Sequence, residues 1–158
     1  MNKTNILSCL FYSALTGGLT GATVFVFKLL ATKAEEISRR LYSLSKESLL
    51  YVGIAIASLV VLALIMRLIH HLVPEAKGGG IPRSEGILRE LISFRPVRTL
   101  FATFTGSIIS FFAGVGVGSE GPSVLIGTSI SKILPHNDKN ILTGGASAGF
   151  AGLITGLS

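Results

Sequence analysis

Three long stretches without a charged residue constrain what this chain can fold into. They cover residues 5–27, 48–66 and 99–119, and none of them contains Asp, Glu, Lys or Arg. A helix needs roughly 20 mainly apolar residues to cross the ~30 Å hydrocarbon core of a bilayer, and each stretch approaches or exceeds that length. Residues 48–66, rich in Leu, Ile, Val and Ala, form the clearest span. The pattern predicts an all-α, polytopic integral membrane protein.

The composition points the same way. Hydrophobic residues make up 49% of the 158 residues and charged residues 14%, whereas about 25% charged residues is typical of soluble domains. The formal net charge of +6 is spread between apolar stretches rather than gathered in one stripe. We therefore expect the basic residues to meet lipid headgroups, and we predict no nucleic-acid partner. A multi-pass location in the plasma or inner membrane follows from these expectations.

The polar segments between the stretches carry less information. Residues 28–47 hold charges of both signs, which predicts a helix end followed by a surface connection, and residues 67–98 are mixed. Because the two segments hold five and six Lys or Arg residues, the positive-inside rule gives no orientation. A cleaved signal peptide is an alternative for the first stretch, but its apolar run exceeds the usual 7–15 residues.

The last part of the chain alternates between short apolar and polar segments. Residues 123–131 are apolar but too short to span a bilayer. Residues 135–140 predict a turn, with Asp138 or Asn140 capping the next helix. The chain reaches Ser158 inside an uncharged segment, so we expect residues 1–158 to be part of a transmembrane domain that is truncated at its C-terminus.

Glycines also recur at four-residue spacing, a pattern that lets membrane helices approach closely. The pairs are Gly17 and Gly21, Gly145 and Gly149, and Gly152 and Gly156.

Two Gly/Pro motifs carry the functional signal. Residues 78–82 read Gly-Gly-Gly-Ile-Pro, and residues 118–122 read Gly-Ser-Glu-Gly-Pro. Proline is favoured in the first turn of a helix, so each motif predicts a helix start. Glycines there leave backbone N–H groups uncovered, and the helix N-terminus adds partial positive charge. Such broken helices bind anions without a formal cation, a recurrent device in transporters.

Glu120 is the most informative residue of the second motif. It ends the third uncharged stretch, where an ionisable group is costly and is a functional hypothesis by default. Its carboxylate can occupy an anion site itself, and protonation would release it. Glu120 therefore predicts a gate that also carries a proton. The alternative, which the residues alone leave open, is a water-exposed glutamate that stabilises a helix dipole.

The two motifs resemble those of the CLC family of chloride channels and chloride/proton antiporters. Residues 75–82 are similar to its Gly-Ser-Gly-Ile-Pro motif, and residues 118–122 to its Gly-Arg-Glu-Gly-Pro motif. Residues 95–98 and 143–150 fit the family's order as well. The resemblance implies an all-helical homodimer with broken and re-entrant helices and two inverted repeats, of which this chain would supply most of the first.

The resemblance also implies a site. Glu120 matches the external gating glutamate, and the transported ligand would be chloride or a similar anion, with protons as a second substrate and no cofactor. Gly79 stands where the family often has serine, and Ser119 replaces a frequent arginine. A voltage-gated channel and an antiporter are not distinguished. The implied anion-binding residues are Gly78, Gly79, Gly80, Ile81, Ser119, Glu120 and Gly121.

Other functions compete with this reading. Gly116, Gly118 and Gly121 satisfy Gly-x-Gly-x-x-Gly, which would indicate a nucleotide-binding enzyme if strands surrounded it. We find no such alternation and predict no enzyme. His70 and His71 lack further ligands nearby, so we predict polar anchors at the membrane edge and no metal site. A membrane fragment or structural remnant that does not transport is the remaining alternative.

Overall fold

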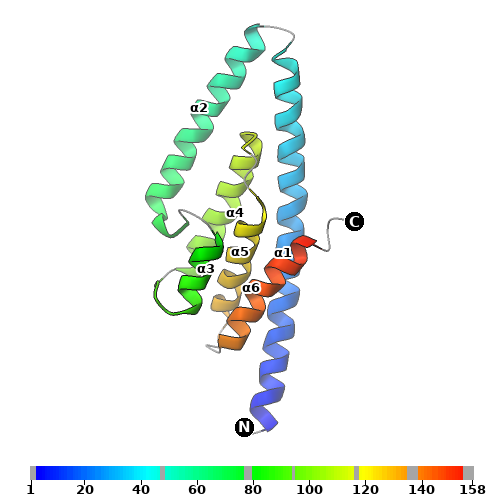
Figure 1. The fold of residues 1–158 in the computed structure, drawn as a ribbon, viewed down its shortest axis with the longest axis vertical. Coiled ribbons are helices and arrows are strands. Elements are labelled where there is room, and N and C mark those ends of the chain that lie inside the picture. The colour runs from blue at the N-terminus through cyan, green and yellow to red at the C-terminus, as the bar shows by residue number, and fades with distance from the viewer. Residues whose placement is uncertain are drawn as a thin grey trace.

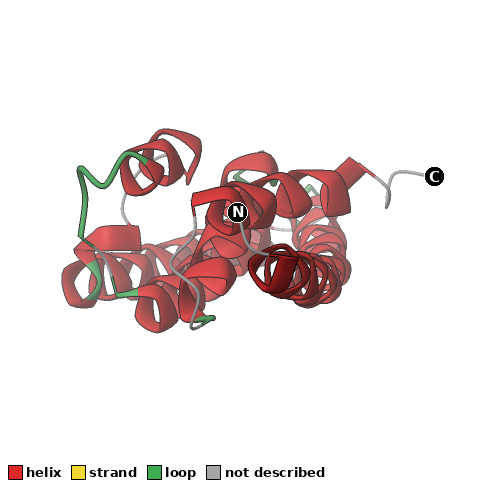
Figure 2. Cartoon of the chain, turned by 90° about the horizontal axis from the view of Figure 1, so that it is seen from below, coloured by secondary structure: helices red, strands yellow, loops and turns green. Residues whose placement is uncertain are grey.

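The protein is all-helical in a computed structural model that describes residues 3–46, 49–76, 80–93, 95–115, 118–134 and 139–154, without a strand among them. Figure 2 shows only helices and loops in these segments. The predicted fold class is therefore confirmed. The elements are α1 (Lys3–Leu44), α2 (Leu49–Leu72), a 3-10 helix η1 (Pro74–Ala76), α3 (Gly80–Leu88), α4 (Pro96–Phe112), α5 (Glu120–Ile133) and α6 (Lys139–Ile154).

Helix α1 is one continuous helix of 42 residues (Figure 1), so the prediction of a surface connection over residues 28–47 is wrong. The physical reason is a buried stripe at three- and four-residue spacing that continues through the charged segment. Charged residues occupy the opposite face, where Arg39 and Glu35 form an exposed ion pair at 2.7 Å. The stripe consists of Thr16, Thr20, Val24, Phe27, Ala31, Ala34 and Ser38.

The main core lies where α1 meets α4 and α5. Phe27 of α1 is fully buried, and its ring lies 5.5 Å from the ring of Phe104 and 6.3 Å from that of Phe111. Val24, Ile126 and Ile130 complete the buried cluster. Large aromatic and branched side chains of three helices thus fix α4 and α5 against the long helix.

Helix α5 occupies the centre of the bundle, and each of residues 125–131 is buried. It has 14 residues, or about 21 Å at 1.5 Å per residue, which is too short to cross a bilayer, as predicted for this segment. Gly145 and Gly149 of α6 pack against it so closely that a Cβ on Gly149 would overlap the Ser123 carbonyl oxygen. The four-residue glycine spacing of this pair therefore does serve close helix packing.

Helix α2 lies at the edge and forms a splayed hairpin with α1 (Figure 1). Helix α2 is long and apolar enough to span a membrane. Only 6% of its most apolar 18-residue segment is buried inside the protein. Among the described residues, two helical segments are long and apolar enough to cross a membrane: α2 and residues Ser8–Leu44 of α1. An exposed apolar helix of this kind is typical of a membrane environment.

The third expected span, residues 99–119, is not one helix. Helix α4 ends at Phe112, and Gly114 adopts a φ of +74°. Tyr42 Oη donates a hydrogen bond of 2.8 Å to the carbonyl oxygen of Ala113 and ties this end to α1. Glycine adopts a positive φ without the steric cost of a Cβ, so it supplies the break.

The start of α6 corrects one further expectation. Asn140 lies inside the helix, which begins at Lys139, and therefore does not cap it. Residues 139 and 140 of the turn predicted over residues 135–140 are therefore helical, and Asp138 and the rest of that turn lie outside the described residues.

Candidate functional site

The structure brings the two Gly/Pro motifs into backbone contact. Gly80 is the first residue of α3, and Gly121 is the second residue of α5. A Cβ built on Gly80 would overlap the carbonyl oxygen of Gly121, and a Cβ on Gly121 would lie 3.3 Å from the amide nitrogen of Gly80. The N-termini of two helices thus meet at a point that only glycine permits. We call this contact the Gly80–Gly121 junction.

Both prolines lie in the first turn of their helix, although neither is its first residue. Pro82 is the third residue of α3, and Pro122 is the third residue of α5. The first-turn N–H groups of a helix have no partner within the helix, and the macrodipole adds partial positive charge there. The junction therefore places two such ends side by side.

Glu120 is the first residue of α5, and its side chain is exposed. A carboxylate in the first turn stabilises the helix dipole, as the competing explanation for this residue assumes. Ser119 is the N-cap residue but makes no side-chain capping bond. Instead, Ser123 Oγ donates a hydrogen bond of 2.7 Å to the Ser119 carbonyl oxygen. The hydroxyl of Ser119 is thus not committed to capping the helix.

The remaining predicted site residues divide into two groups. Ile81 lies in the first turn of α3 and is 49% exposed. Gly78 and Gly79 lie outside the described residues. Of the predicted anion-binding set, the structure therefore brings together Gly80 and Gly121, with Ile81, Ser119 and Glu120 next to them in the chain.

Glu75 of η1 contacts the N-terminus of α4, an interaction that the sequence did not predict. Its Oε2 accepts hydrogen bonds from the Arg95 backbone N–H at 3.0 Å and from Thr99 Oγ1 at 3.1 Å. These groups lie at the N-terminus of α4, where a carboxylate is electrostatically favourable. Glu75 thus links the short helix η1, which precedes α3 in the chain, to the N-terminus of α4.

A cavity of about 280 Å³ lies directly beside the junction. Helices α2, α4 and α5 form its walls, with Gly80 at the start of α3. The lining residues are Met66, His70, Ala76, Gly80, Ala102, Thr103, Gly106, Ser107, Ser110, Gly118, Gly121, Pro122 and Leu125.

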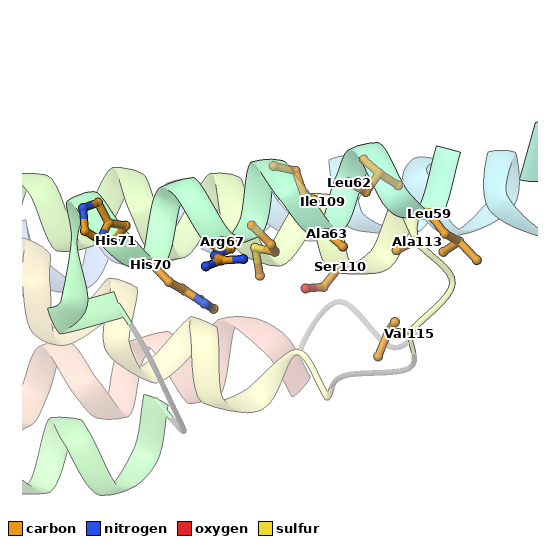
Figure 3. Close-up of a pocket in the computed structure, with 11 residues that line it drawn as sticks. Leu59, Leu62, Ala63, Arg67, His70, His71, Ile109, Ser110, Ala113 and Val115 are labelled. Atoms are coloured by element: carbon orange, nitrogen blue, oxygen red, sulfur yellow. The ribbon is translucent and has the colours of Figure 1, made fainter. Parts of the chain in front are cut away.

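A larger cavity of about 800 Å³ lies between α2 and the C-terminal half of α4 (Figure 3). Arg67, His70 and His71 line it together. The spacing of Leu59, Met66 and His70 on α2 could have revealed this face, because residues three, four and seven apart share a helix side. The membrane-edge role of the histidines stays a prediction. The described residues contain no cluster of three potential metal ligands.

The Gly-x-Gly-x-x-Gly pattern lacks the context that a nucleotide site needs. Helix α4 precedes Gly118 and Gly121, where a dinucleotide-binding fold has a strand. Gly116 lies outside the described residues.

Comparison with known proteins places the chain in a family. The family described as voltage gated chloride channel matches residues 60–154, which include both Gly/Pro motifs. Proteins named H(+)/Cl(-) exchange transporter ClcA from Salmonella schwarzengrund, Salmonella agona and Salmonella gallinarum are each 32% identical over 130 residues. The match covers 81% of this chain and 28% of each relative, so the chain spans little more than a quarter of their length. On the family match, the chain belongs to the voltage-gated chloride channel family.

Proposed function

We propose that this chain forms one wall of a transmembrane anion pathway. The observation that carries the proposal is the Gly80–Gly121 junction, where two helix N-termini meet without intervening side chains. Partial positive charge from helix ends attracts an anion, and the absence of a lysine or arginine among these motif residues keeps binding weak enough for turnover. The anion-binding backbone comprises Gly78 to Ile81 and Ser119 to Gly121.

Glu120 acts in this proposal as the gate. Glu120 is the first residue of α5, next to the proposed anion-binding backbone, and its exposure allows it to exchange protons with water. The unprotonated side chain occupies the site, and protonation neutralises it and lets it leave. The relatives' name includes exchange of H(+) for Cl(-), which supports a proton-accepting role here and favours exchange over a channel.

The chain acts as part of a larger transmembrane assembly. Helices α3 and α5 have 9 and 14 residues and cannot span a bilayer, so their ends must be covered by other protein. Residues 1–158 would supply most of the first of two inverted repeats, and the complete protein would be a multi-pass homodimer with lipid around α2.

The test is chloride and proton flux from liposomes that contain the full-length protein. Glu120→Gln should remove the pH dependence of chloride flux, because glutamine mimics the protonated side chain and never ionises. Glu36→Gln is the matched control, since Glu36 is exposed on α1, far along the chain from the junction. Unchanged proton coupling in the Glu120 variant would refute the gate.

A further inference from the structure

An apolar groove of about 520 Å³ lies between the C-terminal end of α2 and the N-terminal half of α4. Its volume is within the range of about 300–1,000 Å³ that is typical of small-molecule sites. The described residues that line it include none from the two Gly/Pro motifs, so this groove is separate from the Gly80–Gly121 junction. We call it the α2–α4 groove. Its apolar walls are Ile69, Leu72 and Val73 of α2 and Val97, Phe101 and Ala102 of α4.

The walls of the α2–α4 groove remain open to the surroundings of the protein. Leu72 and Phe101 are each 65% exposed. Val97 and Thr105, which both line the groove, are eight positions apart on α4, or about 12 Å at 1.5 Å per residue. That length is close to the ~15 Å of one leaflet, half of the ~30 Å hydrocarbon core. An acyl chain therefore fits lengthwise between the two helices.

Arg98 lies at one end of the groove, directly before the uncharged stretch of residues 99–119. Among the described residues that line the groove, Arg98 is the only ionisable one. No hydrogen bond or ion pair joins its exposed guanidinium to another described residue. A guanidinium presents its N–H donors in a planar fork that matches the oxygens of a phosphate. The boundary of the apolar stretch thus carries a phosphate-binding group that is available to a ligand.

The other charges at this end of the groove leave Arg98 available to an anionic headgroup. Arg95 lies three residues before Arg98, on a neighbouring position of the helix surface. Glu75 lies at the same end of α4, but its Oε2 already accepts a hydrogen bond from the Arg95 backbone N–H and a second one from Thr99 Oγ1. Positive charge therefore exceeds negative charge where the apolar groove begins.

We propose that the α2–α4 groove binds an anionic phospholipid. One acyl chain lies between α2 and α4, from Val97 towards Thr105, and the phosphate contacts the guanidinium of Arg98. The lining includes none of the proposed anion-binding residues. Lipid binding here therefore does not depend on the proposed anion pathway, and failure of either proposal leaves the other intact.

The first test titrates the full-length protein in detergent micelles with phosphatidylglycerol or with phosphatidylcholine of identical acyl chains. Native mass spectrometry counts the bound lipids. Phosphatidylglycerol should bind more tightly, and Arg98→Gln should lower its affinity about fivefold, as expected for one basic residue that meets an anionic lipid. The affinity for phosphatidylcholine should change little. Arg40→Gln is the matched control, because Arg40 is exposed on α1 and does not line the groove.

The second test blocks the part of the groove that would hold the acyl chain. Thr105 is exposed on α4 and lines the groove, so the ring of Thr105→Phe would fill this space without entering the core. Binding of both lipids at this site should be lost. Ala57→Phe places the same ring at an exposed position of α2 that does not line the groove, and it should leave binding unchanged.

Two results would overturn the proposal. Equal binding of phosphatidylglycerol by the wild type, Arg98→Gln and Thr105→Phe would show that lipid associates elsewhere or that the rest of the full-length protein covers the groove. Glycerol phosphate, which has the phosphate but no acyl chain, is the second probe. If it displaces phosphatidylglycerol at equal concentration, the occupant is a soluble phosphate and not a lipid.

Discussion

The carbonyl oxygen of Gly121 occupies the space that a side chain on Gly80 would need. This contact joins two segments that are about forty residues apart in the sequence, at the N-termini of α3 and α5. The two backbones are in direct contact at the junction. A methyl group on Gly80 would therefore force the two helix ends apart. The predicted anion site therefore depends on the absence of a side chain.

Gly80→Ala should destabilise the protein and, under the proposed function, abolish chloride flux. Overpacking a tight contact typically costs about 1–3 kcal/mol, because the backbone must move. Thermal or denaturant unfolding in micelles measures the loss. Gly53→Ala on α2 is the control, because a Cβ there meets nothing within 4 Å. Equal stability of the two variants would show that the junction is looser than described.

Glu75→Ala should lower stability by about 1–2 kcal/mol, because the N-terminus of α4 loses an acceptor for both Arg95 N–H and Thr99 Oγ1. Glu85→Ala is the matched control. Its ion pair with Arg89 is exposed, and exposed i,i+4 pairs contribute only about 0.3–0.5 kcal/mol. The free energy of unfolding of each variant is the measurement. A Glu75 variant no weaker than the Glu85 variant would contradict the assigned contact.

Gly149→Ala should separate α6 from α5. A Cβ on Gly149 would overlap the Ser123 carbonyl oxygen, and the expected cost is about 1–3 kcal/mol. Gly144→Ala on the same helix meets nothing within 4 Å and should be neutral or slightly stabilising, because alanine has the higher helix propensity. Unfolding monitored by circular dichroism distinguishes them, and identical curves would argue against the glycine contact.

Tyr42→Phe should cost about 1 kcal/mol, because the hydrogen bond to the Ala113 carbonyl oxygen is lost. Gly114→Ala should cost at least as much. A φ of +74° is unfavourable for alanine by about 1–2 kcal/mol, and its Cβ would lie 2.6 Å from Cε2 of Tyr42. Unfolding midpoints measure both variants. If both variants unfold like the wild type, α1 and the end of α4 are not joined as described.

The sequence by itself determined the class of the protein and the two helix starts. An uncharged stretch of bilayer-spanning length predicts an α-helix, and α2 contains most of one such stretch, whereas residues 99–119 do not form a single helix. A proline shortly after glycines predicts the first turn of a helix from local backbone chemistry alone. These features depend on neighbouring residues, so they can be read without the fold.

Only the tertiary structure decided where helices end and which segments meet. Residues 28–44 stay helical because Ala31, Ala34 and Ser38 are buried against the rest of the protein. The sequence near these residues does not show which segments bury them. Likewise, the contact between Gly80 and Gly121 and the cavity beside it arise from packing between distant segments. Neighbouring residues set the helical conformation of a segment. The free energy gained by burying its side chains depends on the other segments that pack against it.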